Sequence, residues 1–415
     1  MSKYMKSVLR PYWYFLKTIF RKTNQFFLKP FRALPISSEN FGPPKGYYLS
    51  VSNWLQVNSE PGANYQEIYA SDCLVRSPPK TLDSEVHWKF TLEYRRQIPH
   101  AFLAVIPQGR IWVNRGISVN NSAIITSNDR LLADLSLEFG KQPQDNLIFE
   151  QWKLPSVRVL SGNAVVLTMA KGEIYFHWML DLLPKFKLLS LGNIDLARVD
   201  YFIVNSIQSS FQKETLGCIG IPEDKVLEST VYPHIKADRL IVPSLPSLSG
   251  NPTKWVCEFL REQFLSHNSS YDRTIDRLYI SRKNARYRKV IDEDRICQFL
   301  TEKLGFETVA LETLKVKEQA ALFNRIKVII APHGAGLTNL VFCSPGTTVI
   351  EIFSPNYVNV CYYSLCQEIG LNYYYLIGEG MQPNKGIDPH FAGDNITIDM
   401  IKLQKIIEFA GVVSP

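Results

Sequence analysis

The sequence lacks several patterns that would place it quickly in a class of protein. Its seven cysteines include no CxxC pair, so neither a disulfide framework nor a cysteine-rich zinc site is indicated. Cysteines of this kind, several of them in apolar runs, are typical of a reducing compartment. No tract of low complexity occurs, and 46% of the residues are hydrophobic. The composition therefore predicts a globular chain rather than a disordered one.

Long hydrophobic runs without charge are also missing, so no helix across a membrane is predicted, and no small-residue cleavage site suggests a signal peptide. Residues 1–32 nevertheless carry eight Lys and Arg and no acid, whereas the remainder holds 38 basic and 39 acidic residues. Aromatic and basic residues alternate in this segment, which suits the surface of an anionic membrane. A disordered basic tail or a helix packed on its own domain are the alternatives. We predict a cytoplasmic protein, peripheral at the inner membrane face, with no nucleic-acid partner because the remainder has no basic excess.

The length of 415 residues exceeds what one hydrophobic core usually organises. Short strand-like runs occupy about residues 90–170, and two series of apolar strands alternating with helices follow, separated by the Pro- and Ser-rich residues 244–253. Apolar strands in this pattern predict parallel sheets covered on both faces. The predicted fold is α/β, with two Rossmann-like domains facing a cleft and a β-rich N-terminal portion. The predicted parts are a basic aromatic segment (1–35), an N-terminal domain (36–250) and a C-terminal domain (251–415).

The most informative stretch is KVIIAPHGAGLTNLVFCSPGTTVIEIF, residues 327–353. It places His333 and Glu351 at the carboxyl ends of two apolar strands, where open parallel sheets bind ligands. The turn Gly334-Ala335-Gly336 leads into a predicted helix, whose free N–H groups favour a phosphate. His333 would bind the same phosphate, and the two oxygens of Glu351 suit a ribose diol. A tightly packed turn and a glutamate paired with a nearby base are the structural alternatives.

Two other enzyme classes are disfavoured by what surrounds this turn. HGAG is similar to the HGGG oxyanion loop of esterases, but the chain contains no G-x-S-x-G nucleophile elbow. A dinucleotide-binding G-x-G-x-x-G is incomplete, because Asn339 takes the place of the third glycine. The acidic run Asp292-Glu293-Asp294 is better explained by capping at the start of a helix, and no His/Cys cluster has zinc spacing. No metal site and no cofactor are therefore predicted.

Two further groups of residues carry chemistry. Arg282 follows a predicted strand in SRKNARYRK, and arginine forks match pyrophosphate oxygens; Arg286 is the second candidate there, and the rest of the cluster reads as a solvated loop. His177 and Asp181 are four residues apart on a predicted helix over 175–190 and therefore share a face. A structural hydrogen-bonded pair is the alternative for these two.

Three motifs in this order, YFHWMLDLLPKF, LYISRKNARYRKVIDEDRI and APHGAGLTNLVFCSPGTTVIEIF, resemble the family 61 glycosyltransferases. The resemblance covers about residues 90–380. It implies a GT-B architecture, a nucleotide-sugar donor in the C-terminal domain, an acceptor-side N-terminal domain, and inversion at the anomeric carbon. The chain departs from the family pattern at Ile174-Tyr175 and at Lys185, where an arginine is common. The residues that match motif positions are Arg282, His333, Gly334, Ala335, Gly336 and Glu351.

The sequence therefore predicts a metal-independent glycosyltransferase that moves a sugar from a nucleotide-sugar donor, a UDP-sugar, to a carbohydrate hydroxyl in polysaccharide or glycan synthesis. An inverting transfer needs a base from the opposite domain. Asp181 is the first candidate and His177 the second, or the two act as a pair in which Asp181 orients the imidazole. The alternatives are a sugar-nucleotide epimerase on the same two-domain plan and a non-catalytic carbohydrate-binding relative.

Overall fold

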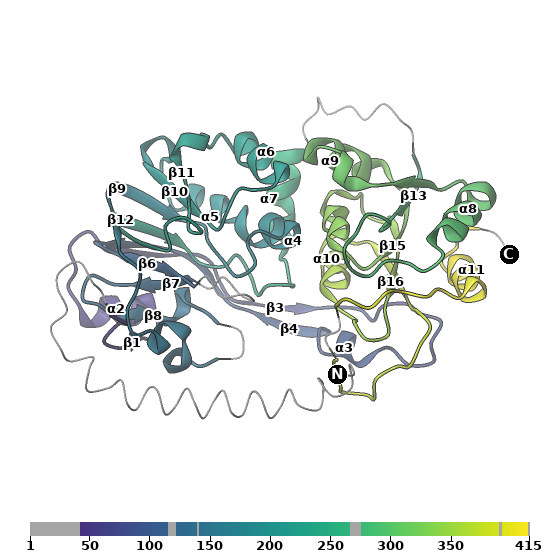
Figure 1. Ribbon diagram of the computed structural model, residues 1–415, viewed down its shortest axis with the longest axis horizontal. Coiled ribbons are helices and arrows are strands. Elements are labelled where there is room, and N and C mark those ends of the chain that lie inside the picture. Colours follow the sequence, from purple (N-terminus) through teal and green to yellow (C-terminus); the bar gives the residue numbers. More distant parts are fainter. Residues whose placement is uncertain (1–41, 115–121, 139–140, 266–274, 390–391, 414–415) are drawn as a thin grey trace.

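The computed structural model describes residues 42–114, 122–138, 141–265, 275–389 and 392–413. Its two main sheets lie side by side, one built from the first half of the chain and the other from the second (Figure 1). The predicted α/β class is confirmed. Within the described residues, no helix is long and apolar enough to cross a membrane. The predicted membrane segment, residues 1–32, lies outside the described residues.

The first sheet is mixed and contains ten strands among the described residues. Strands β12, β9, β10 and β11 run parallel to one another, whereas β5 and β6 pair with β12 in the antiparallel direction. The strands of this sheet are β1 (Tyr47–Tyr48), β2 (Asn64–Tyr69), β5 (Ala101–Pro107), β6 (Arg110–Val113), β7 (Ser122–Ile125), β8 (Leu131–Leu132), β9 (Arg158–Val166), β10 (Tyr201–Val204), β11 (Val226–Glu228) and β12 (His234–Pro243). The predicted mixture of a β-rich start and a later parallel block is therefore present.

The second sheet has the order β14-β13-β15-β16-β17, and all its strand pairs are parallel. The inner strands β15 and β16 are almost wholly apolar, because helices cover both faces of the sheet, whereas the edge strand β14 is mostly polar. The strands are β13 (Arg277–Ile280), β14 (Glu307–Val309), β15 (Val328–Pro332), β16 (Thr348–Phe353) and β17 (Asn372–Ile377). The predicted runs KVIIAP and TVIEIF correspond to β15 and β16.

The helices lie against these sheets and between them (Figure 1). They are α2 (Val51–Val57), α3 (Trp88–Thr91), α4 (Tyr175–His177), α5 (Lys185–Leu191), α6 (Ser210–Ile219), α7 (Lys254–Phe264), α8 (Glu293–Leu304), α9 (Val316–Arg325), α10 (Cys361–Ile369) and α11 (Met400–Phe409). The predicted helix over 175–190 consists of α4, a π-helical turn at Trp178–Leu182, and α5. Pro184 interrupts it because proline has no backbone N–H to donate.

One expectation about helix starts is confirmed and one is wrong. The helix predicted near Gly336 is present as a 3₁₀ helix over Ala335–Phe342. Asp292 precedes α8 in a left-handed conformation, and its side chain makes no capping hydrogen bond. Its neighbour Glu293 instead turns inward and accepts hydrogen bonds from the Arg282 backbone N–H and the Tyr279 hydroxyl. The acidic run therefore fixes the end of β13 rather than the start of the helix.

A segment from the first half of the chain, residues 76–94, packs on the second sheet. We call it the crossing segment; it leaves β3 (Asp72–Val75), contains α3, and returns through β4 (Arg95–Ile98) (Figure 1). Lys80 exchanges backbone hydrogen bonds with Tyr373 and Tyr375 of β17, which extends that sheet by one bridge. Phe90 is fully buried there. The predicted division at residues 250 and 251 stays a prediction, and this exchange of chain crosses it.

One continuous apolar cluster joins the two halves. It includes Phe186 of α5 and Phe202 of the first sheet, and Ile329 and Val349 of the second sheet. The Pro- and Ser-rich residues 244–253 connect β12 to α7 and are packed rather than loose, since Ser247 and Asn251 are buried. The continuous core fixes the relative position of the two sheets, and with it the distance between side chains that face each other across them.

Candidate active site

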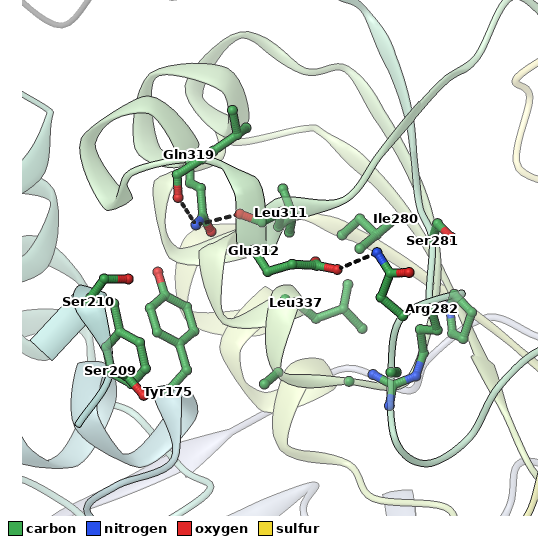
Figure 2. A pocket seen from close by; sticks show the side chains of 18 residues that line it. Tyr175, Ser209, Ser210, Ile280, Ser281, Arg282, Leu311, Glu312, Gln319 and Leu337 are labelled. Atoms are coloured by element: carbon green, nitrogen blue, oxygen red, sulfur yellow. Dashed lines mark hydrogen bonds between the residues drawn. The ribbon is translucent and has the colours of Figure 1, made fainter. Parts of the chain in front are cut away.

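A cavity of about 660 Å³ lies where the two halves meet, at the carboxyl ends of β13, β14 and β15. Tyr175, Ser209 and Ser210 line it from the first half, opposite Arg282 and Ser281 from the second (Figure 2). The carboxyl ends of neighbouring parallel strands meet at one edge, which is why ligands of such sheets bind there. The position agrees with the ligand site that the sequence predicts.

The HGAG turn forms one wall of this cavity through Pro332, Gly334, Ala335 and Gly336. A Cβ atom on Gly334 would lie 1.9 Å from Nη1 of Arg282, so a larger residue would displace the guanidinium from this position. The backbone at Gly334 is extended, with φ of −177°, so this glycine is required by close approach and not by a left-handed turn. A Cβ on Gly336 would come within 2.9 Å of Leu311. Both glycines therefore let the turn lie against its neighbours.

Arg282 lines the cavity, and two backbone carbonyls outside the cavity lining fix its guanidinium. Its Nε donates to the carbonyl of Arg288 at 3.0 Å, and its Nη2 donates to the carbonyl of Tyr287 at 2.5 Å. Burial, together with the nearby Arg288, lowers the pKa of Arg282 to about 10. Within the described residues, neither arginine forms an ion pair with a carboxylate. An anion in the cavity would relieve this excess of positive charge.

Arg286 lies elsewhere. Its side chain is exposed, its guanidinium lies 5.3 Å from the ring of Tyr287, and it does not line the cavity. Arg288 takes the inner position instead, since its Nε donates to the carbonyl of His333 at 3.1 Å and its Nη1 to the carbonyl of Ala392 at 2.8 Å. Sequence spacing could not separate the two arginines, because the loop reverses the chain at Arg288, where φ is 53°.

His333 and Glu351 come together, but behind the cavity wall. Nδ1 of His333 lies 2.5 Å from Oε1 of Glu351, and the hydroxyl of Tyr373 donates to Oε2 of Glu351 at 2.5 Å. Glu351 is 0% exposed and both of its oxygens are engaged within the protein, so its contact with a ribose diol stays a prediction, which this geometry disfavours. The ring of His333 packs among Phe353, Tyr357 and Tyr362 rather than lining the cavity. The structural alternative, a glutamate paired with a nearby base, describes the pair.

Glu312 is the acidic side chain that does line the cavity, and the sequence reasoning missed it. It follows β14, and its Oε1 accepts a hydrogen bond from Asn284 Nδ2 at 3.1 Å (Figure 2). The signal was present in the run ETVALE, because a polar residue just after an apolar strand lies at the ligand edge of the sheet. Gln319 lies nearby with its amide held by the carbonyls of Leu311 and Leu314.

On the other side of Tyr362 lies a second histidine–carboxylate pair. The ring of Tyr362 is 5.2 Å from that of His333 and 5.6 Å from that of Phe176, the residue before His177. His177 Nδ1 is 2.7 Å from Asp181 Oδ2, which also accepts a hydrogen bond from Ser249 Oγ at 2.8 Å. Asp181 is buried, whereas the side chain of His177 is 19% exposed. Ser249 had no signal in the sequence beyond its place in the connecting residues 244–253.

This second pair favours one of the two arrangements considered for the base. Asp181 lies behind the imidazole and has no access to a ligand, so it fits the orienting member of the pair rather than a base acting alone. With Nδ1 engaged by the carboxylate, Nε2 of His177 is left as the nitrogen that can accept a proton. Among the described residues, no group of three His, Cys, Asp or Glu side chains has the arrangement of a metal site.

The fold and the cavity together define an α/β protein with a ligand site at the carboxyl ends of a parallel sheet. Residues 175–350 match the family model Glycosyltransferase 61, and this range contains every residue that lines the cavity. Over 142 residues the chain is 28% identical to the EGF domain-specific O-linked N-acetylglucosamine transferase of Drosophila melanogaster, a match that covers 32% of this chain and 26% of that relative. Both similarities agree with the predicted resemblance to the family 61 glycosyltransferases, and the family match covers residues 175–350. The chain spans only about a quarter of the length of this relative.

Proposed function

We propose that this protein is an inverting glycosyltransferase of GT-B type that moves a sugar from a UDP-sugar to a carbohydrate hydroxyl in polysaccharide or glycan synthesis. The observation that carries the proposal is the cavity between the two sheets, where Arg282 lies against Gly334 without a carboxylate partner among the described residues. The family match supports glycosyl transfer, and the name of the relative supports transfer to oxygen.

In this proposal the diphosphate of the donor lies beside Arg282 and the HGAG turn. The guanidinium supplies charge-assisted hydrogen bonds to the phosphate oxygens, and Arg288 adds positive charge from behind. Glu312 replaces Glu351 as the carboxylate that accepts hydrogen bonds from the ribose hydroxyls. His333 and Glu351 hold the turn in place rather than touching the donor. Since arginines neutralise the leaving group, no metal ion or other cofactor takes part.

The acceptor hydroxyl attacks the anomeric carbon from the face opposite the diphosphate. A bond forms between the acceptor oxygen and the anomeric carbon, the bond to the phosphate oxygen breaks, and the nucleoside diphosphate leaves with the electron pair. Nε2 of His177 takes the proton of the hydroxyl, while Asp181 stabilises the imidazolium that results. Ser249 fixes the carboxylate through its hydrogen bond to Oδ2.

The experiment combines a binding screen with a turnover assay. A thermal-shift panel of UDP-, GDP- and CMP-sugars should raise the melting temperature most with a UDP-sugar, since a ligand that binds only the folded state stabilises it. Release of UDP should then require a carbohydrate acceptor and should persist in EDTA. Release without an acceptor, or interconversion of the donor sugar, would favour an epimerase, and binding without turnover would favour a carbohydrate-binding relative. Loss in EDTA restored by manganese would contradict the metal-independent mechanism.

We also propose that the protein acts on the cytoplasmic side of a membrane, held by the eight basic residues of the segment 1–32. Each such residue near an anionic surface contributes on the order of 1 kcal/mol. Sedimentation with phosphatidylserine vesicles should fall when residues 1–32 are removed and when salt is raised. Equal sedimentation of full-length and truncated protein would contradict this location.

A further inference from the structure

Asn339, which takes the place of the third glycine in the incomplete G-x-G-x-x-G pattern, is fully buried and does not line the donor cavity. Its Oδ1 accepts a hydrogen bond from the hydroxyl of Tyr175 at 2.7 Å. Its Nδ2 donates to Oε1 of Gln319 at 2.6 Å and to the carbonyl of Gly336 at 3.1 Å. We call the side chains of Tyr175, Asn339 and Gln319 the polar bridge. It joins α4 of the first half to two elements of the second half that line the cavity, α9 and the HGAG turn.

The direction of every hydrogen bond in the polar bridge is fixed by the backbone. Nε2 of Gln319 donates to the carbonyls of Leu311 and Leu314 at 3.0 and 2.9 Å, and a carbonyl can only accept. Oε1 of the same amide must therefore accept, so the amide nitrogen of Asn339 faces it and Oδ1 of Asn339 faces Tyr175. Tyr175 must then donate, and burial raises the pKa of its phenol, which keeps the proton in place. The polar bridge thus has one arrangement, which no rotation of an amide can reverse.

The two ends of the polar bridge lie where the proposed reaction requires a fixed distance. At one end, Leu311 and Leu314 flank Glu312, the proposed ribose contact in the cavity. At the other end, Tyr175 lies two residues before His177, the proposed base, in the one-turn helix α4. The polar bridge therefore connects a donor contact of the second half to the base of the first half through the protein rather than through the ligand.

The first turn of α4 depends on Tyr175 for a directional contact. The ring of Tyr175 packs edge-on against that of Phe211, with the ring centroids 5.0 Å apart, and faces the cavity (Figure 2). Within the part of the chain that the structure describes, no side chain caps the start of α4, where Ile174 has no polar group. Packed rings tolerate small sliding movements, whereas a hydrogen bond weakens steeply when its geometry changes. The hydroxyl of Tyr175 therefore limits how far this turn can shift against the second half.

We propose that Tyr175 is a positioning residue for the transfer: through Asn339 and Gln319, it holds the helix of His177 in register with the loop that binds the donor. The proposal rests on the proposed glycosyl transfer with His177 as its base. The transfer requires fixed distances from Nε2 of His177 to the acceptor oxygen and from that oxygen to the anomeric carbon. A displacement of about 1 Å from such a geometry can cost roughly a hundredfold in rate.

The test uses the full chain and the variant Tyr175→Phe, which removes the hydroxyl and keeps the ring. Tyr363→Phe is the matched control, because the hydroxyl of Tyr363 also donates across the two halves at 2.7 Å, but to the carbonyl of Ser77 in the crossing segment. Each variant is also combined with His177→Ala. The measurements are kcat and KM with the UDP-sugar and acceptor that the binding screen and turnover assay identify, UDP affinity by calorimetry, and urea unfolding.

We expect Tyr175→Phe to lower kcat by roughly tenfold or more, because the base shifts while the donor stays bound. UDP affinity and the KM for the donor should stay at the wild-type values. Tyr363→Phe should lose a similar amount of stability and keep the wild-type kcat. With His177→Ala already present, Tyr175→Phe should lower kcat by less than about twofold further, since a group that acts through the base has nothing left to position.

Three outcomes would overturn the positioning role. They are a wild-type kcat in Tyr175→Phe, an equal loss of kcat in Tyr363→Phe, and losses that multiply when Tyr175→Phe is combined with His177→Ala. A fall in UDP affinity with kcat unchanged would also overturn it, because Tyr175 would then be a donor contact. Failure of the wild type to bind UDP or any UDP-sugar would instead overturn the proposed function.

Discussion

The molecule contains two histidine–carboxylate pairs, and they differ in burial more than in geometry. His333 and Glu351 lie 2.5 Å apart, with side chains 6% and 0% exposed, whereas His177 and Asp181 lie 2.7 Å apart, with side chains 19% and 3% exposed. Each pair lies at the junction of the two halves, and Tyr362 separates them. In the sequence, His333 and Glu351 belong to the more specific motif, and that motif made them the stronger candidates for ligand binding.

The difference indicates that the role of a histidine–carboxylate pair depends on the hydrogen-bond partners of its carboxylate. Glu351 uses both oxygens within the protein, on His333 and on Tyr373, so the C-terminal pair is closed and stabilises the turn that faces the donor cavity. The N-terminal pair presents an imidazole edge outward and keeps its carboxylate inside. An acid–base role requires access to the substrate, and of the two histidines His177 has the more exposed side chain.

The largest expected effect is on turnover, in variants of the more exposed pair, His177 and Asp181. His177→Ala should lower turnover by roughly a hundredfold or more, because proton transfer from the acceptor is lost while donor binding is kept. Asp181→Asn should give a loss of similar order, since the imidazole loses its orienting charge. Steady-state kinetics with UDP affinity measured in parallel checks both. Near-normal turnover in the two folded variants would place the base elsewhere.

The next effect concerns the donor cavity. Arg282→Ala should weaken UDP binding by roughly ten- to a hundredfold, the equivalent of about 1.5–3 kcal/mol for a charge-assisted contact. Gly334→Ala should act in the same direction without removing a charge, because the new methyl group would occupy the place of Nη1 of Arg282. Arg286→Ala, at an exposed position, is the matched control and should bind UDP as the wild type does. Equal losses in Arg282→Ala and Arg286→Ala would break this assignment of the arginines.

A smaller effect, on stability, is expected at the closed pair. Glu351→Gln removes the charge from two buried hydrogen bonds and should lower the free energy of unfolding by about 1.5–3 kcal/mol, with UDP affinity close to wild type. Tyr373→Phe removes one of the two bonds and should cost less. Urea unfolding and calorimetry measure the two quantities separately. If UDP affinity fell while stability stayed constant, Glu351 would have to contact the ligand after all.

The smallest effect is a pH dependence of stability. Burial lowers the pKa of His333 below its usual value of 6.5, with Glu351 opposing and both arginines assisting the shift. Because the unfolded chain then binds the proton more readily, this histidine contributes stability above pH 6.5 that is lost as the pH falls toward the lowered pKa. His333→Gln should therefore show a shallower decline in melting temperature between pH 7 and pH 5 than the wild type. A decline as steep as that of the wild type would mean that other groups account for it.

Much of the architecture could be read from local patterns. The apolar runs at β15 and β16 and the helix at α6 follow from periodicity within a few residues, and the parallel pairing follows from the absence of a polar face. The edge of the sheet where a ligand would bind could also be predicted, because the HGAG turn comes directly after a strand. The crossing segment could not be predicted, since its contacts join Lys80 to β17, almost three hundred residues away.

The sequence by itself determined the strand and helix order of the second half, the resemblance to family 61 glycosyltransferases, and the turn that lines the cavity. These features depend on neighbouring residues, whose spacing fixes which face they share. Only the tertiary structure decided that Glu351 pairs with His333 and Tyr373, that Arg288 rather than Arg286 turns inward, and that Ser249 completes the cluster around Asp181. The physical reason is that a buried polar group must find a partner, and the partner is chosen by packing between segments far apart in the chain.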